Sequence, residues 1–178
     1  IYLEEHPNAK IHVIDSLSAG GEVDLLVRKL NHLVAEGLDF DQVVNAITNY
    51  KSKTNLLFVL AKVDNLVKNG RLSKLVGTVV GLLNIRMVGE ASKTGTLELL
   101  QKARGQKKAI KAAFDELLKA GYAARHITIS HRNNEKFIEQ FSEVVREKFA
   151  QASIEVLPTS GLCSFYAEEG GLLMGYEI

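Results

Sequence analysis

The feature that most constrains the fold is an alternation of short apolar runs with amphipathic stretches in the second half of the chain. Residues 106–120 carry one apolar stripe at helical spacing that is closed by Gly121, which predicts a helix. The run HITISH follows, then an amphipathic stretch over residues 134–150, then the run SIEVLPT. These runs predict strands, so the succession of strands and helices predicts an α/β architecture.

The first half continues this alternation. The run KIHVIDS, residues 10–16, is rich in β-branched side chains and predicts a strand. The segment GEVDLLVRKLNHLVAEG predicts a helix that stops at Gly37, and a second helix begins at Asp39, where Gln42 completes a capping-box pattern. The apolar run over residues 54–61 predicts a buried strand, and residues 63–69 predict a short helix that ends at Gly70.

Two further segments have less regular patterns. Residues 85–105 predict two strands around a turn at Thr94 and Gly95, although TLELLQKAR also fits a helix. The tail from residue 163 onward predicts paired strands around residues 168–171, which would place Cys163 in an apolar strand as a small buried residue.

Length and charge narrow the class of protein. A chain of 178 residues with 46% hydrophobic residues can bury a substantial core without disulfides or metals. Its single cysteine cannot form an intramolecular disulfide, so we expect a cytoplasmic location. A net charge of +1 argues against nucleic acid as a partner, and no apolar run reaches the roughly 20 residues that a membrane span needs. Because the chain begins at Ile1 in polar sequence, we expect a fragment of a longer protein.

A short basic turn, KNGRLSK, opens into an apolar stretch over residues 72–83. Apolar residues cover nearly the whole circumference of the predicted helix, so it must be buried in protein or line an apolar cavity. Gly77 and Gly81 each cost roughly 1 kcal/mol relative to alanine, which close approach of a backbone or a ligand would justify. Tight helix packing is the commoner reason for such glycines, and Arg71 in the turn also fits a simple solvated loop.

The stretch DSLSAGG combines two hydroxyls and two glycines directly before a predicted helix. O–H and N–H groups at the start of a helix can bind an anion, and the helix dipole favours negative charge there. The alternative is that Ser18 only caps the helix.

A basic segment, KARGQKKAIKAA, surrounds the start of the helix at residue 106. Its lysines fit a solvated helix face, and a nucleic-acid site would need interleaved aromatic residues that the segment lacks. Arg104 stands at the junction of strand and helix, where it could grip a carboxylate with both of its terminal nitrogens.

The sequence carries no recognisable catalytic motif. The five histidines show no metal-ligand spacing, and there is no nucleophile elbow, P-loop or dinucleotide fingerprint. We therefore expect neither a metal nor another cofactor, and no catalysis by this chain.

Taken together, HVIDSLSAGG, KNGRLSKLVGTVVGLLNIRMV and KARGQKKAIKAAFDELL resemble the DegV family of bacterial fatty-acid-binding proteins. The similarity covers nearly the whole chain. It implies two α/β domains with one long-chain fatty acid, such as palmitate, buried between them and presented to a fatty-acid kinase. Residues 1–70 would be the latter part of a Rossmann-like first domain, and residues 71–178 the second domain.

The resemblance also implies which residues surround the carboxylate. Ser18 would supply the head-group hydroxyl, Gly20 and Gly21 would supply N–H groups, and Arg71 and Arg104 would face the carboxylate or the kinase. The family often has a His-x-Gly-x-Gly element near the C-terminus. This chain has SFYAEEGG there, with Tyr166 in the histidine position, where it could supply a hydroxyl to the carboxylate instead. The missing histidine weakens the inference of a kinase partner more than the inference of a lipid ligand.

Two other functions remain open at this point. A small-molecule kinase or phosphotransferase would use Arg71 and Arg104 on phosphate, with Asp15, Glu168 and Glu169 as candidate metal ligands. A regulatory or nucleic-acid-binding domain would use residues 102–111.

Overall fold

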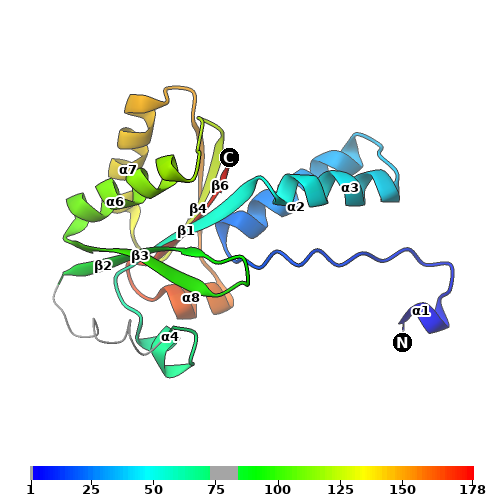
Figure 1. Ribbon diagram of the computed structural model, residues 1–178, viewed down its shortest axis with the longest axis horizontal. Helices are drawn as coiled ribbons and strands as arrows, with labels where there is room; N and C mark the ends of the chain where they lie inside the picture. Colours follow the sequence, from blue (N-terminus) through cyan, green and yellow to red (C-terminus); the bar gives the residue numbers. More distant parts are fainter. Residues whose placement is uncertain (1, 73–83) are drawn as a thin grey trace.

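The computed structural model describes residues 2–72 and 84–178. At its centre is one six-stranded sheet with the order β3-β2-β1-β6-β4-β5 (Figure 1). The strands are β1 Thr54–Leu60, β2 Ile85–Ala91, β3 Leu97–Arg104, β4 His126–His131, β5 Ser153–Pro158 and β6 Leu172–Glu177. Within this described sheet β4 and β5 pair in parallel, whereas the other neighbouring pairs are antiparallel.

Seven helices are present in the described residues. They are α1 Tyr2–Glu5, α2 Gly21–Ala35, α3 Phe40–Lys51, α4 Asp64–Lys68, α6 Gln106–Lys119, α7 Glu135–Lys148 and α8 Gly161–Ala167. In Figure 1, α6 and α7 lie on one side of the sheet, α4 and α8 lie at its lower end, and α2 and α3 extend to the right. The fold is therefore a mixed α/β fold, as the alternation of runs predicts.

The central strand β1 supplies two separate cores. Because side chains alternate between the faces of a strand, Leu57 and Val59 pack with α6 and α7, whose Leu117 and Phe141 are fully buried. Leu56, Phe58 and Leu60 point to the opposite face and pack with residues of α4, α8 and β6. The second face carries the candidate site.

Helix α2 sits unusually close to this second face. A Cβ atom placed on Gly21 would lie 2.1 Å from the Thr128 carbonyl oxygen and 2.7 Å from the Gly175 nitrogen. Gly175 is equally tight, since its Cβ would lie 2.2 Å from the Glu22 nitrogen. The start of α2 therefore rests on β4 and β6 through glycines, and the loop before α2 is fixed against the sheet.

Most of the predicted elements are confirmed. Helix α3 begins with the predicted capping box, in which the Gln42 N–H donates to the Asp39 carboxylate at 2.9 Å and the Asp39 N–H donates to the Gln42 side chain at 3.0 Å. The hairpin of β2 and β3 turns at residues 92–96, so the strand interpretation of TLELLQKAR is correct. The predicted helix over residues 72–83 lies outside the described residues except for Leu72, which is buried.

Two predicted strands are wrong. Residues 10–16 form no strand, because no described strand lies beside them to accept a hydrogen-bonded ladder, and Val13 remains 81% exposed. The tail forms one strand instead of two: residues 161–167 are helix α8, which contains Cys163, and only β6 follows it. The turn between them uses left-handed backbone at Glu168 and Gly170, which reverses the chain into β6.

The predicted domain boundary at residue 70 passes through the sheet. Strand β1 precedes this boundary and its partners β2 and β6 follow it, so one sheet spans the two predicted segments. The division into residues 1–70 and 71–178 stays a prediction.

Candidate functional site

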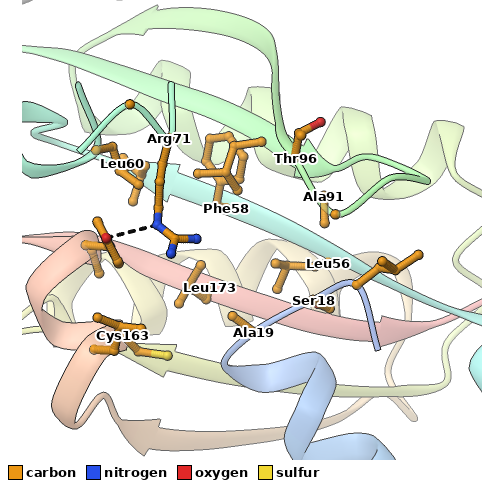
Figure 2. Close-up of a pocket in the computed structure, with 18 residues that line it drawn as sticks. Ser18, Ala19, Leu56, Phe58, Leu60, Arg71, Ala91, Thr96, Cys163 and Leu173 are labelled. Carbon is orange, nitrogen blue, oxygen red and sulfur yellow. Dashed lines mark hydrogen bonds between the residues drawn. The ribbon is translucent and has the colours of Figure 1, made fainter. Parts of the chain in front are cut away.

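A cavity of about 490 Å³ opens on the second face of the sheet (Figure 2). Its floor is apolar and consists of Leu56, Phe58 and Leu60 from β1 and Leu173 from β6. Helices α4 and α8 form one wall, with Leu66, Leu162, Cys163, Tyr166 and Ala167. The opposite wall combines the loop before α2 with the β2–β3 hairpin, through Leu17, Ser18, Ala19, Ala91, Gly95, Thr96 and Leu97. This size lies in the range of small-molecule sites, roughly 300–1,000 Å³.

Arg71 places a positive charge in this space, whose floor is apolar. Figure 2 shows its side chain pointing from the loop after α4 into the cavity, toward Leu173. Its Nε–H donates to the Tyr166 hydroxyl oxygen at 2.9 Å, and its guanidinium carbon lies 5.0 Å from the centre of the Tyr166 ring. Among the described residues Arg71 forms no ion pair, so its charge is available to an anionic ligand.

Helices α4 and α8 are held together by polar contacts that position Arg71 beside Tyr166. The Asn65 backbone N–H, in the first turn of α4, donates to the Glu168 carboxylate at 2.9 Å. The Asn65 side-chain amide donates to the Phe165 carbonyl at 2.8 Å. Because these bonds join the start of α4 to the end of α8, the two sides of this wall are fixed relative to each other.

The Ser18 hydroxyl lies in the opposite wall. Its Oγ atom is buried and has no hydrogen-bond partner in the part of the chain that the structure describes. The loop is tied locally, since the Ser18 N–H donates to the Ser16 hydroxyl at 3.3 Å. A Cβ on Gly95 would lie 3.3 Å from the Leu17 side chain, so the hairpin turn packs on the same loop. A buried hydroxyl without a partner costs free energy, and a polar ligand group would relieve that cost.

The structure brings only some of the predicted site residues together. Ser18, Arg71 and Tyr166 line the cavity. Gly20 and Gly21 are not among its lining residues and instead pack against the sheet, where a Cβ on Gly20 would lie 2.6 Å from the Ser130 hydroxyl. Arg104 ends β3 with an exposed side chain and also lies outside the lining.

The acidic residues considered for a phosphotransferase are not assembled around the two arginines. Glu168 is engaged at the start of α4, and Glu169 lies near Arg132 and Asn133. No group of three or more metal-ligating side chains occurs in residues 2–72 and 84–178. No specific observation therefore favours the phosphotransferase reading.

A cluster of carboxylates lies on the other face of the hairpin. Glu90 in β2 stands directly opposite Glu98 in β3. Burial raises the pKa of Glu90, and the nearby charges of Glu98 and Glu116 raise it further. The cluster is separated from the cavity by the sheet, so it bears on stability and not on the candidate site.

Sequence reasoning missed the cavity floor and the contribution of α8. Leu56, Phe58 and Leu173 look like ordinary core residues, because a buried strand face has the same pattern whether it packs on a helix or borders a cavity. Cys163 and Tyr166 belong to the segment that was predicted as strand. Two signals in the sequence were available. The two glycines that follow residue 169 indicate a tight turn, and the small residues before these glycines are compatible with a helix.

The fold and the site define a class of protein. In the described residues they combine a mixed α/β fold, a largely apolar cavity with the Arg71 side chain pointing into it, and a buried Ser18 hydroxyl that has no hydrogen-bond partner among those residues. None of the helices in the described ranges has both the length and the apolar character that crossing a membrane requires.

Comparison with known proteins gives the family. The model described as "Uncharacterised protein, DegV family" matches residues 1–176, so the chain belongs to the DegV family. A DegV domain-containing protein of Streptococcus gordonii is 75% identical over the whole chain, which covers 63% of that protein. The chain therefore spans less than two thirds of the length of this relative.

Two solved structures share the fold and carry fatty acids. The Fatty Acid Kinase (Fak) B3 protein of Streptococcus pneumoniae, loaded with linoleic acid, is 76% identical with a TM-score of 0.97 over 99% of this chain and 63% of that one. A DegV family protein of Eubacterium eligens, loaded with heptadecanoic acid, is 38% identical with a TM-score of 0.94 over 99% of this chain and 64% of that one. The predicted family and fold are thereby confirmed.

Proposed function

We propose that this protein binds one long-chain fatty acid, such as palmitate, in the cavity of the second sheet face. The observation that carries the proposal is the combination of an apolar floor, the Arg71 charge and the Ser18 hydroxyl, which has no partner among the described residues, in one space of about 490 Å³. The acyl chain lies against the leucines and Phe58, and the carboxylate takes the charge of Arg71 and hydrogen bonds from hydroxyl groups. Ser18 and Tyr166 line opposite walls of the cavity with hydroxyls, and the hydroxyl of Thr96, which also lines it, is already hydrogen-bonded to the Ser92 hydroxyl.

The expected energetics agree with tight binding. Burying about 14 methylene groups at roughly 0.8 kcal/mol each contributes about 11 kcal/mol of gross transfer free energy, before the cost of ordering the ligand. A carboxylate that leaves water must be compensated, and a charge-assisted bond to Arg71 contributes that compensation. The acyl tail therefore sets the affinity, while the polar groups set the orientation of the ligand.

The bound acid is presented to a fatty-acid kinase, and the chain itself is a carrier and not a catalyst. The description of the pneumococcal relative as a Fatty Acid Kinase B3 protein supports this partner. Arg104, exposed at the end of β3, then belongs to the surface that faces the kinase. We place this carrier in the cytoplasm, because its single cysteine fits a reducing compartment.

Native mass spectrometry of the purified protein, followed by solvent extraction and lipid analysis, tests the binding function. We expect a mass increase of one fatty acid per chain, and we expect uptake of added palmitate after the lipid is removed. A protein that purifies without lipid and also fails to take up palmitate would refute the proposal. The kinase step is tested separately, by incubating the loaded protein with ATP and a fatty-acid kinase and measuring acyl phosphate.

A further inference from the structure

Arg71 has a fixed backbone and a long, exposed side chain. It follows α4 in a Schellman motif, in which the Arg71 N–H donates to the Leu66 carbonyl at 2.9 Å and the Gly70 N–H donates to the Val67 carbonyl at 3.1 Å. Gly70 has a φ of +66°, as the left-handed residue of this motif requires. The chain therefore determines where the Arg71 side chain starts, whereas the direction of its guanidinium depends on what the side chain contacts.

Tyr166 contacts this guanidinium in two ways. Its hydroxyl oxygen accepts a hydrogen bond from Arg71 Nε at 2.9 Å, and the centre of its ring lies 5.0 Å from the guanidinium carbon. Figure 2 draws the bond at Nε as a dashed line, and the two terminal nitrogens of Arg71 point away from this bond into the cavity. Because the bond uses Nε, both terminal nitrogens keep their N–H groups for a ligand.

The Tyr166 ring is itself fixed. It is half-buried in α8 and packs against the core below the cavity. The Phe165 ring meets it edge-on, with 5.0 Å between the ring centres and 74° between the planes. Helix α8 is joined to α4 by the Asn65 side chain, which donates to the Phe165 carbonyl at 2.8 Å. A flexible arginine that rests on a fixed ring loses less conformational entropy when it binds an anion.

We propose that Tyr166 is a positioning residue for Arg71. The bond at Nε and the contact with the ring direct the two terminal nitrogens toward the carboxylate of the bound acid, so that both can donate to it. This inference rests on the proposed function. It assigns Tyr166 a role that acts through Arg71 and not through a separate hydrogen bond to the ligand. The pair thereby favours an anionic head group over a neutral one on the same acyl chain.

A double-mutant cycle separates these two roles of Tyr166. Tyr166→Phe is made in the wild type and in the Arg71→Gln protein, and each full chain is stripped of lipid. The dissociation constants of palmitate and of hexadecanol, the neutral alcohol of the same length, are measured by partitioning radiolabelled ligand between the protein and a lipid-binding resin. Tyr122→Phe is the matched control: its hydroxyl also makes a hydrogen bond, to the Arg125 carbonyl at 2.7 Å, but Tyr122 belongs to the core on the other face of the sheet.

We expect Tyr166→Phe to weaken palmitate binding about threefold, the factor that one net hydrogen bond represents, and to leave hexadecanol binding unchanged. In the Arg71→Gln protein the same change should leave palmitate binding unchanged, because no guanidinium remains to be directed. Tyr122→Phe should bind both ligands as the wild type does.

Three results would overturn this inference alone. A threefold loss of palmitate affinity in both backgrounds would mean that Tyr166 contacts the carboxylate independently of Arg71. An equal loss for palmitate and hexadecanol would mean that Tyr166 only shapes the cavity wall. Unchanged palmitate affinity in both backgrounds would mean that Tyr166 has no role in binding the head group. A wild-type protein that binds no palmitate would instead overturn the proposed function.

Tyr166→Leu tests the contribution of the ring. This change removes the aromatic face as well as the hydroxyl, so the affinity for palmitate relative to hexadecanol should fall about fivefold, more than in Tyr166→Phe. In the Arg71→Gln protein the relative affinity should again stay unchanged. A Tyr166→Leu protein with the same relative affinity as Tyr166→Phe would contradict the part assigned to the ring.

Discussion

Replacing Gly21 by alanine tests how α2 is seated on the sheet. In an open helix this change would be stabilising by roughly 0.5–1 kcal/mol, because glycine loses more backbone entropy than alanine on folding. Here the added methyl carbon would lie 2.1 Å from a backbone oxygen of β4, well below the 3.0 Å that real contacts observe, so α2 or β4 must move by nearly 1 Å. Overpacking of this kind costs roughly 1–3 kcal/mol. Taking the middle of each range, about 2 kcal/mol of overpacking against about 0.75 kcal/mol of backbone entropy, we expect a net loss of about 1 kcal/mol.

The assay is urea unfolding followed by far-UV circular dichroism, because the chain has no tryptophan to report by fluorescence. Gly37→Ala is a control with the opposite properties: its φ is +78° and nothing lies within 4 Å of the added carbon, so it measures backbone strain without a clash. A Gly21→Ala protein as stable as the wild type would refute the close seating of α2. Because Ser18 and Ala19 lead directly into α2, we also expect weaker fatty-acid binding in this variant.

Three further changes test the site and its surroundings. Arg71→Gln should weaken palmitate binding about tenfold and reduce its dependence on salt, whereas Tyr166→Phe should have a smaller effect. If a titration gives the Arg71→Gln protein the same affinity for palmitate as the wild type, Arg71 does not bind the head group. Asp39→Ala should lower the free energy of unfolding by about 1 kcal/mol in urea titrations, because it removes the capping box of α3. The change does not touch the cavity, so palmitate uptake should equal that of the wild type. Glu90→Gln should stabilise the protein at pH 7. The raised pKa of Glu90 means that the native state holds the carboxyl proton more tightly than the unfolded state does. The contribution of Glu90 to stability is therefore full below the ordinary pKa of 4.5 and is lost as the pH rises through the raised pKa. The gain should therefore vanish below pH 4.5, and it stays under about 1 kcal/mol because the carboxyl is largely solvated; a gain that persists in melting curves at low pH would contradict this cause.

The amphipathic helices and the central strand could be predicted from the sequence because their patterns depend on local spacing. The stripe of α6 and the capping box of α3 are read within one or two turns. Residues 10–16 show where this fails: β-branched residues favour extended backbone, but a strand also needs a partner that the pattern does not supply. The prediction of a strand in place of helix α8 fails for the opposite reason. The local sequence leaves this segment ambiguous, and contacts with α4 through Asn65 stabilise the helix.

The candidate site was predictable only in its polar residues. Arg71 and Ser18 stand out in the sequence because a charge beside an apolar run and hydroxyls before a helix suggest an anion. Gly20 and Gly21 also pack the start of α2 closely on β4 and β6, a contact that the local sequence does not show, and their N–H groups at the head-group site stay a prediction. The floor residue Phe58 in β1 pairs with Gly89 in β2, about 30 positions along the chain, and local patterns do not determine this register.

A crystal structure of the protein saturated with ω-brominated palmitate tests the central claim most directly, because anomalous scattering locates the bromine and the density of the acyl chain leads back to the carboxylate. We expect the bromine inside the cavity, the acyl chain on the floor formed by β1 and β6, and the carboxylate within hydrogen-bond distance of Arg71 or of the Ser18 or Tyr166 hydroxyl. A bromine signal outside the cavity, or an empty cavity in crystals grown with excess ligand, would contradict the account.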